Sequence, residues 1–276
     1  MPLFAVQHAE DPRLAAYTSI REKDLTAGHG GRFIVEGKVT LETLLTRSRF
    51  AVESLFLCET RLAPLADILT HVPEGVPVYV APQAVMDAVA GFPMHRGVLA
   101  CGLKGEAEMN AALLSHVPAF AGDTASSTVL MLSGLSNHDN VGACFRNAAA
   151  FGADAVLLDA QCCDPLYRKA IRVSSGASLW LPFAHGGSGA GMVQASQDAG
   201  YTVWAMTPRA GAAPLGSLPV PDRLAILLGA EGPGLPDDLI AAAVPVGIPM
   251  SAGFDSVNVA TAGAIALAHA FAARCG

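Results

Sequence analysis

The sequence is poor in charged residues and especially in basic ones. Only 15% of its 276 residues are charged, and 17 Lys or Arg stand against 24 Asp or Glu, for a formal net charge of −7. A protein that binds nucleic acid indiscriminately needs a basic surface to neutralise phosphates, so this balance excludes that class. Composition by itself favours an enzyme that acts on a small molecule.

The patterns of metal binding, secretion and membrane insertion are also missing. The six cysteines form no CxxC pair and no histidines cluster at the spacing of zinc ligands, so we expect no metal site. Residues 1–11 hold two acids, no basic residue and no apolar run of the kind a secretory signal needs. The most apolar stretch, residues 257–268, is too short to span a bilayer. We therefore expect no membrane partner and a cytoplasmic, reducing location.

Apolar residues, in contrast, are abundant at 52%, enough to bury a large core and to exclude wholesale disorder. In residues 1–105, apolar runs of strand length alternate with helical patterns, which predicts a small α/β domain. The expected strands lie at 33–37, 54–58, 76–80 and 97–102, and the expected helices at 12–25 and 39–45. Residues 106–127, which contain a helical pattern at 111–117 before small and polar residues, are predicted to link this domain to the next.

Residues 128–276 predict a second and larger α/β domain. Its apolar runs are nearly continuous and are separated by helical patterns, which indicates a mostly parallel sheet covered on both faces. The runs lie at 128–134, 155–159, 201–206, 224–229 and 246–249, with helices expected at 141–151 and 258–273.

The first chemically suggestive segment, residues 133–152, follows one of these strands. Asn140 is a natural helix cap, Gly142 permits close approach of a ligand, and Arg146 lies one helical turn further on. The arginine can therefore point towards whatever occupies the helix start. A capped helix with a surface arginine explains the same residues.

The second segment, residues 227–240, is a glycine-rich loop around an acid. Gly229, Gly232 and Gly234 surround Glu231 in a GxxGxG spacing with no following GK[ST], which excludes a P-loop and weakens a dinucleotide fingerprint. Since Glu231 would repel a phosphate, the loop suits a neutral or cationic ligand such as a sugar hydroxyl, an amine or a sulfonium. An ordinary strand-to-helix turn is the competing interpretation.

In the third segment, residues 247–271, a strand ends at Pro249 and a loop of small residues leads to Ser256 and Asn258 at a helix start. Capping by Ser256 is a sufficient structural explanation. No serine lies in a GxSxG elbow, so a hydrolase triad lacks support.

Taken in order and spacing, the three segments resemble the SpoU (TrmH-like) branch of the SPOUT methyltransferase superfamily. An Asn-x-Gly-x-x-x-Arg motif, a Gly-x-Glu-Gly-x-Gly loop and an Ile-Pro-Met segment ending in Ser-x-Asn-Val are all present. The matching residues are Asn140, Gly142 and Arg146; Gly229, Glu231, Gly232 and Gly234; and Ile248, Pro249, Met250, Ser256, Asn258 and Val259. Residues 11–14, Arg32 and residues 33–45 resemble the family's substrate-binding module, which is related to the L30e-like fold.

The resemblance implies a homodimer that transfers a methyl group from S-adenosylmethionine to a ribose 2′-hydroxyl of ribosomal or transfer RNA. The catalytic domain, residues 128–276, would carry a deep trefoil knot, a rare exception to unknotted topology. By similarity, backbone at Gly229, Ile248 and Val257 would hold the cofactor, although the family usually has Leu at the last position. The smaller domain, residues 1–105, would bind RNA.

The resemblance also suggests roles for individual side chains. Arg146 is the family's candidate for activating the hydroxyl, but a guanidinium stays protonated in proteins and is a poor base. We therefore expect it to position the 2′-oxygen and stabilise negative charge. Asn140, Glu231, Ser256 and Asn258 would orient Arg146 and the ribose, with some contacts crossing the dimer interface, and Arg32 and Arg172 would contact RNA.

Three alternatives remain open at this point. A SPOUT enzyme acting on a base is disfavoured because Asn140 and Arg146 with Ser256 match the ribose branch. A non-catalytic RNA-binding or ribosome-assembly factor would keep the fold without turnover. A Rossmann dehydrogenase is disfavoured, because this sequence lacks the glycine-rich turn that follows the first strand in that fold.

Overall fold

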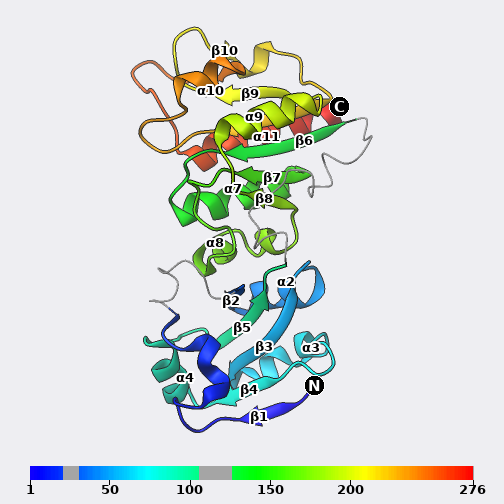
Figure 1. Ribbon diagram of the computed structural model, residues 1–276, viewed down its shortest axis with the longest axis vertical. Coiled ribbons are helices and arrows are strands. Elements are labelled where there is room, and N and C mark those ends of the chain that lie inside the picture. The colour runs from blue at the N-terminus through cyan, green and yellow to red at the C-terminus, as the bar shows by residue number, and fades with distance from the viewer. Residues whose placement is uncertain (21–30, 106–125, 276) are drawn as a thin grey trace. The chain divides into compact units, whose positions relative to one another are not determined.

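The computed structural model describes residues 1–20, 31–105 and 126–275, which form two compact units (Figure 1). The first unit comprises Met1–Met109 and Leu166–Trp180, and the second comprises Asn110–Pro165 and Leu181–Gly276. The division differs from the expected boundaries, because residues 166–180 group with the N-terminal unit although the sequence placed them in the C-terminal domain. The linker expected at 106–127 lies almost entirely outside the described residues.

The N-terminal unit is built on a mixed five-stranded sheet of order β1-β4-β3-β5-β2. β3 pairs parallel with β4 and antiparallel with β5, which also pairs antiparallel with β2. The four expected strands are present, and the sequence missed β1, an exposed edge strand of three residues. The strands are β1 (Leu3–Ala5), β2 (Arg32–Glu36), β3 (Ala51–Cys58), β4 (Val78–Ala81) and β5 (Val98–Leu103).

Short helices flank this sheet. They are η1 (Pro12–Tyr17), α2 (Lys38–Thr46), η2 (Glu59–Arg61), η3 (Ala63–Leu65), α3 (Ala66–Leu69) and α4 (Gln83–Ala90), joined by α8 (Arg168–Val173) and η5 (Ala177–Leu179) from the later segment. The connection of α8 to this unit is direct, since α8 packs against β2.

The continuous helix predicted at 12–25 is wrong in its described part. A 3-10 helix covers Pro12–Tyr17, Thr18 is extended, and Ser19 has a φ of 49°. Leu14 and Tyr17 are buried and lie three positions apart, which matches the three residues per turn of a 3-10 helix. Residues 21–25 of the prediction lie outside the described residues.

The C-terminal unit contains a seven-stranded sheet in which every pair is parallel, in the order β10-β12-β9-β11-β6-β7-β8. This confirms the predicted fold class of a parallel α/β domain. The strands are β6 (Ser127–Leu132), β7 (Ala155–Leu158), β8 (Phe183–His185), β9 (Thr202–Met206), β10 (Ala213–Pro214), β11 (Arg223–Leu228) and β12 (Val244–Gly247).

Helices cover both faces of this sheet, as the nearly continuous apolar strands predict. The helices are α7 (His138–Ala150), α9 (Gly189–Asp198), η6 (Leu215–Ser217), α10 (Asp237–Ala241) and α11 (Val259–Cys275). On one face, Met192 and Val193 of α9 and Leu239 of α10 enter a single core cluster with the strands. α7 and α11 pack together on the other, where α11 contacts β11 (Figure 1). In the described parts of the chain, no helix is both long and apolar enough to cross a membrane.

Candidate active site

A cavity of about 400 Å³ lies where three neighbouring parallel strands end. β12, β9 and β11 are adjacent in the sheet, and the residues that follow each of them line the cavity. Ligands of open parallel sheets bind outside the carboxyl ends of the strands, and small-molecule pockets occupy about 300–1,000 Å³. Position and size therefore make this cavity the candidate active site.

The glycine-rich loop after β11 forms one wall of the cavity by folding back on itself. The amide of Gly234 donates to the carbonyl of Ala230 at 3.0 Å. A Cβ atom at Gly229 would lie 2.5 Å from backbone atoms of Gly234 and Leu235, a distance that real side chains do not tolerate. Gly232 and Gly234 have φ angles of 86° and 71°, so the turn also depends on left-handed glycine conformations.

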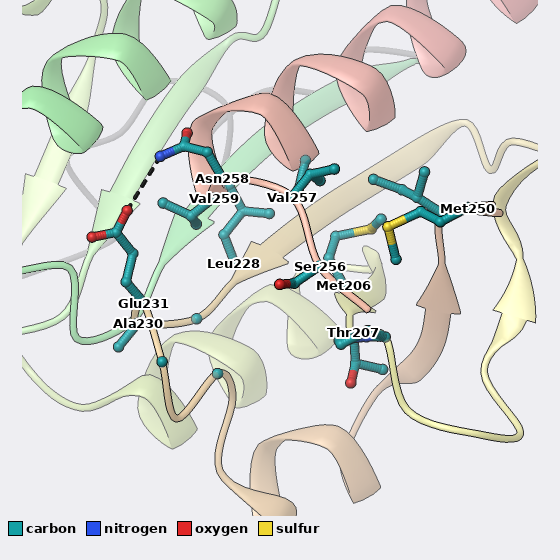
Figure 2. A pocket seen from close by; sticks show the side chains of 16 residues that line it. Met206, Thr207, Leu228, Ala230, Glu231, Met250, Ser256, Val257, Asn258 and Val259 are labelled. Atoms are coloured by element: carbon teal, nitrogen blue, oxygen red, sulfur yellow. Dashed lines mark hydrogen bonds between the residues drawn. The ribbon is translucent and has the colours of Figure 1, made fainter. Parts of the chain in front are cut away.

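Asn258 connects the three predicted segments. Its Nδ2 donates to Asn140 Oδ1 at 3.0 Å and to Glu231 Oε1 at 3.2 Å, the latter visible in Figure 2. The first bond spans 118 residues of sequence and the second spans 27. The structure thus brings Asn140, Glu231 and Asn258 together.

The same asparagine begins the last helix. Asn258 Oδ1 accepts from the amides of Ala260 at 2.9 Å and Thr261 at 3.3 Å, which is an N-cap. The suggestion that Ser256 caps this helix is therefore wrong. Ser256 instead lines the cavity (Figure 2), and its hydroxyl donates to Asp255 Oδ1 at 3.3 Å.

The expected cap of the helix at 141–151 also needs correction. α7 begins at His138, and Asn137 caps it by accepting from the amide of Asp139 at 2.8 Å. Asn140 lies inside the first turn, where it is buried and faces Asn258. Its side chain is thereby free to serve the network rather than the helix end.

Arg146 lies on the exposed side of α7, two turns after Asn140. It makes no side-chain hydrogen bond or ion pair within the described part of the chain, and it does not line the cavity. One position later, Asn147 Nδ2 donates to the carbonyl of Ala260 at 2.8 Å. This bond ties α7 to the first turn of α11 and fixes the helix that presents Arg146.

The three residues expected to hold a cofactor through their backbone, Gly229, Ile248 and Val257, all line the cavity. Sequence reasoning missed Met206 and Thr207, which line it from the end of β9. These two residues belong to no motif, and the only signal was the end of the apolar run at 201–206. Figure 2 labels Met206, Thr207 and Met250 among the residues that line the cavity.

Sequence reasoning also missed Asp159, a buried carboxylate after β7. It accepts the Ser133 hydroxyl at 2.7 Å and the Gly134 amide at 3.1 Å, together with two amides of its own loop. A buried carboxylate is tolerated when its oxygens are satisfied in this way. Asp159 therefore holds the turn that leads from β6 into α7.

The lining of the cavity is mainly apolar and carries one negative charge. Its walls are mainly glycine backbone, two methionines and aliphatic side chains, and Glu231 is the acid among them. No Lys, Arg or His of the described residues lines it. Such a site disfavours a phosphate and suits a neutral or cationic ligand with an apolar body.

The two arginines expected to contact RNA lie in the N-terminal unit. Arg32 on β2 forms an ion pair with Glu53, with nitrogen–oxygen distances of 2.6 and 2.7 Å. This pairing raises the pKa of Arg32 and lowers that of Glu53. Arg172 in the last turn of α8 lines a separate cleft.

Residues 127–268 match the model of the SpoU rRNA Methylase family, slightly more than half of the chain. The chain belongs to this family of methyltransferases. A protein of Mycobacterium bovis that is named as an uncharacterized tRNA/rRNA methyltransferase is 40% identical over 266 residues, which cover 93% of this chain and 88% of the relative. A 23S rRNA (guanosine-2′-O-)-methyltransferase of Photobacterium profundum is 31% identical over 78% of this chain and 86% of that protein.

Solved structures agree with the fold of this SpoU family member. An rRNA methyltransferase from Sinorhizobium meliloti superposes with a TM-score of 0.77 at 19% identity, covering 97% of both chains. The likeness confirms the fold class predicted from sequence. The trefoil knot, the L30e-like relationship and the roles of the individual site residues stay predictions.

Proposed function

We propose that this protein transfers a methyl group from S-adenosylmethionine to a ribose 2′-hydroxyl of ribosomal or transfer RNA. The observation that carries the proposal is the cavity at the strand ends, where an apolar wall, a glycine backbone and one carboxylate meet and where no described residue adds a basic side chain. The relative from Photobacterium profundum that carries the name of a 2′-O-methyltransferase supports the ribose as acceptor.

The lining residues fit this cofactor by chemistry. An adenosine has no phosphate and therefore needs no basic side chain, and none of the described residues that line the cavity supplies one. The aliphatic side chains of Ile248 and Val257 suit an adenine ring. Gly229 and its neighbours expose main-chain groups to hydrogen-bond the polar edges of a nucleoside. Glu231 adds a negative charge that favours a sulfonium. The bound cofactor supplies an electrophilic methyl group.

The chain's own residues have to orient the acceptor and manage its proton. We assign to Arg146 the positioning of the 2′-oxygen and the stabilisation of the negative charge that develops as its proton passes to water. Asn258 keeps Asn140 and Glu231 in place beside the cavity. In-line displacement depends on such alignment, which supplies much of the rate gain in bimolecular transfers.

We include a homodimer in the proposal. Several large apolar side chains at the C-terminal end of the chain are exposed, including Phe254 at 71% and Phe271 at 46%. Exposed apolar surface of this kind suits coverage by a second copy. Size-exclusion chromatography with light scattering tests this part, and an active monomer would contradict it.

The decisive experiment incubates the protein with methyl-labelled S-adenosylmethionine and total RNA, then maps the modified nucleotides. We expect label on ribose 2′-oxygens. Label on bases would move the protein to a base-modifying class, and cofactor binding without any label in RNA would support a non-catalytic RNA-binding factor.

The role of Arg146 has its own test. Arg146→Ala is expected to reduce turnover at least ~100-fold, since removing one positioned donor to a developing oxyanion costs about that much. Calorimetry should show nearly unchanged affinity for S-adenosylmethionine, because Arg146 does not line the cavity. Turnover that survives the substitution would refute the assignment.

A further inference from the structure

The N-terminal unit contains a second cavity, of about 550 Å³, with the opposite electrostatic character. It lies between the junction of β2 with α2, the short helices η2 and η3, and α8, all within one compact unit. Its lining includes the cations Lys38, Arg61, Arg96 and Arg172, and also His95. We call this cavity the basic cleft.

Positive charge prevails in the basic cleft although the chain as a whole is acidic. Four cations line it, and Glu36 is the one acid found there among the described residues. The carboxylate of Glu36 is buried and is already engaged by Arg168, with Arg96 Nε 3.7 Å from its other oxygen. A local excess of about three positive charges therefore stands out against a net charge of −7.

Several donors around the basic cleft have no acceptor. The Nε of Arg61 is buried without a hydrogen-bond partner, while its Nη2 donates to the carbonyl of His95 at 3.1 Å. Within the described residues, the side chains of Lys38 and Arg172 form no hydrogen bond or ion pair. A buried guanidinium nitrogen without an acceptor is costly, so an unmet donor here points to an anionic ligand.

The start of α2 adds backbone donors to the same place. Gly37, Lys38, Val39 and Thr40 all line the basic cleft, and the helix has no side-chain cap. The first amides of a helix lack partners within the helix and carry partial positive charge. Together with arginines, which match phosphate oxygens in geometry, they form a recognisable phosphate-binding arrangement.

We propose that the basic cleft binds backbone phosphates of the RNA substrate and so sets the position of the RNA on the enzyme. The inference rests on the proposed function, since it assumes an RNA substrate. Phosphate contacts fix register without reading sequence. The proposal also changes the expected RNA contacts. Lys38, Arg61 and Arg96 are added to Arg172 as residues that contact RNA, whereas Arg32 is neutralised by Glu53.

The test compares binding of a short fluorescein-labelled RNA of mixed sequence across a series of KCl concentrations. Lys38→Gln combined with Arg172→Gln removes two side chains without internal partners, so the fold should be retained. We expect RNA affinity to fall about 10- to 100-fold at low salt, since hydrogen bonds to charged groups are the strong ones. The slope of log affinity against log salt should drop by about 2.

Arg13→Gln is the matched control. Arg13 lies in the same unit but outside the basic cleft, and Asp11 neutralises it with a nitrogen–oxygen distance of 2.6 Å. Its substitution changes the net charge by one and should leave RNA affinity within about twofold. Arg61→Gln probes the unpartnered donor directly and should weaken RNA binding, with melting temperature recorded to detect misfolding.

The outcomes separate this inference from the proposed function. Unchanged RNA affinity in the double variant, or an equal loss per charge in Arg13→Gln, would overturn the inference even if the wild-type protein methylates RNA. A large loss in the double variant supports the basic cleft even if methyl transfer is never found. Inorganic phosphate could instead raise the melting temperature of the wild-type protein while the variants leave RNA binding unchanged. That result would assign the basic cleft to a free anion and would also overturn the proposal.

Discussion

Replacing Asn258 by aspartate separates its two structural tasks. The carboxylate can still cap α11 by accepting from Ala260 and Thr261, because aspartate and asparagine are comparable N-caps. It cannot donate, so the bonds to Asn140 and Glu231 are lost. Asn258→Asp therefore tests the network while keeping the helix start.

The size of the effect follows from burial. Asn140 is only 7% exposed, and the loss of its donor leaves a buried amide oxygen unsatisfied, at a cost of about 1–3 kcal/mol. Repulsion between the new carboxylate and Glu231 adds only a few tenths of a kcal/mol, because both are exposed to solvent. We expect the free energy of unfolding at pH 7 to fall by about 1–3 kcal/mol.

Urea denaturation followed by circular dichroism measures this change. Asn258→Ala should cost about 1 kcal/mol more than Asn258→Asp, since it also removes the cap. Below a pH of about 4 the introduced carboxyl binds a proton and can donate again, so the deficit of the aspartate variant should shrink. Asn137→Asp is the matched control: Asn137 caps α7 but makes no such network, so its effect should stay under about 0.5 kcal/mol. Equal stability of Asn258→Asp and the wild-type protein would refute the reasoning.

Three further predictions concern the cavity, acid stability and the thiols. Gly229→Ala places a Cβ atom 2.5 Å from fixed backbone and should weaken S-adenosylmethionine binding about 5- to 150-fold, as measured by calorimetry. Gly216→Ala is the control, because a Cβ atom there lies in open space and should not change the affinity. Equal affinities of the two variants would contradict the role of the loop. The ion pair with Arg32 lowers the pKa of Glu53, so the pair stabilises the fold at a pH above the pKa of Glu53 in the unfolded chain, and this stabilisation is lost as the pH falls. The wild-type protein should therefore lose more stability than Glu53→Gln in denaturant titrations from pH 6 to about 3. Parallel curves of stability against pH would refute the claim. Burial raises the pKa of Cys144 to about 12, while Cys275 is exposed, so a thiol reagent at pH 8 should label Cys275 first in peptide mapping, and equal labelling of both would be inconsistent with the fold.

Much of the C-terminal unit could be predicted because its signals are local. Nearly continuous apolar runs mark parallel strands buried on both faces, and polar, glycine-rich segments after them mark strand ends. The motif residues Gly229 and Ile248 reach the cavity because each directly follows such a strand, and Val257 reaches it from the loop between β12 and α11. The helix predicted at 12–25 is wrong in its described part, because the spacing of three between Leu14, Tyr17 and Ile20 fits both a 3-10 helix and an α-helix over a short span.

The sequence by itself determined the strand and helix segments, the parallel character of the large sheet and the polar residues at its strand ends, because hydrophobic period and turn chemistry act between near neighbours. Only the tertiary structure decided which segments meet. The strand order that puts β9 between β12 and β11 brings Met206 and Thr207 into the cavity, and Asn258 reaches Asn140 across 118 residues. The packing of α8 on β2 likewise places Arg172 in the same cleft as Arg61 and Arg96. Such contacts depend on how whole elements pack, and no local pattern of residues encodes that choice.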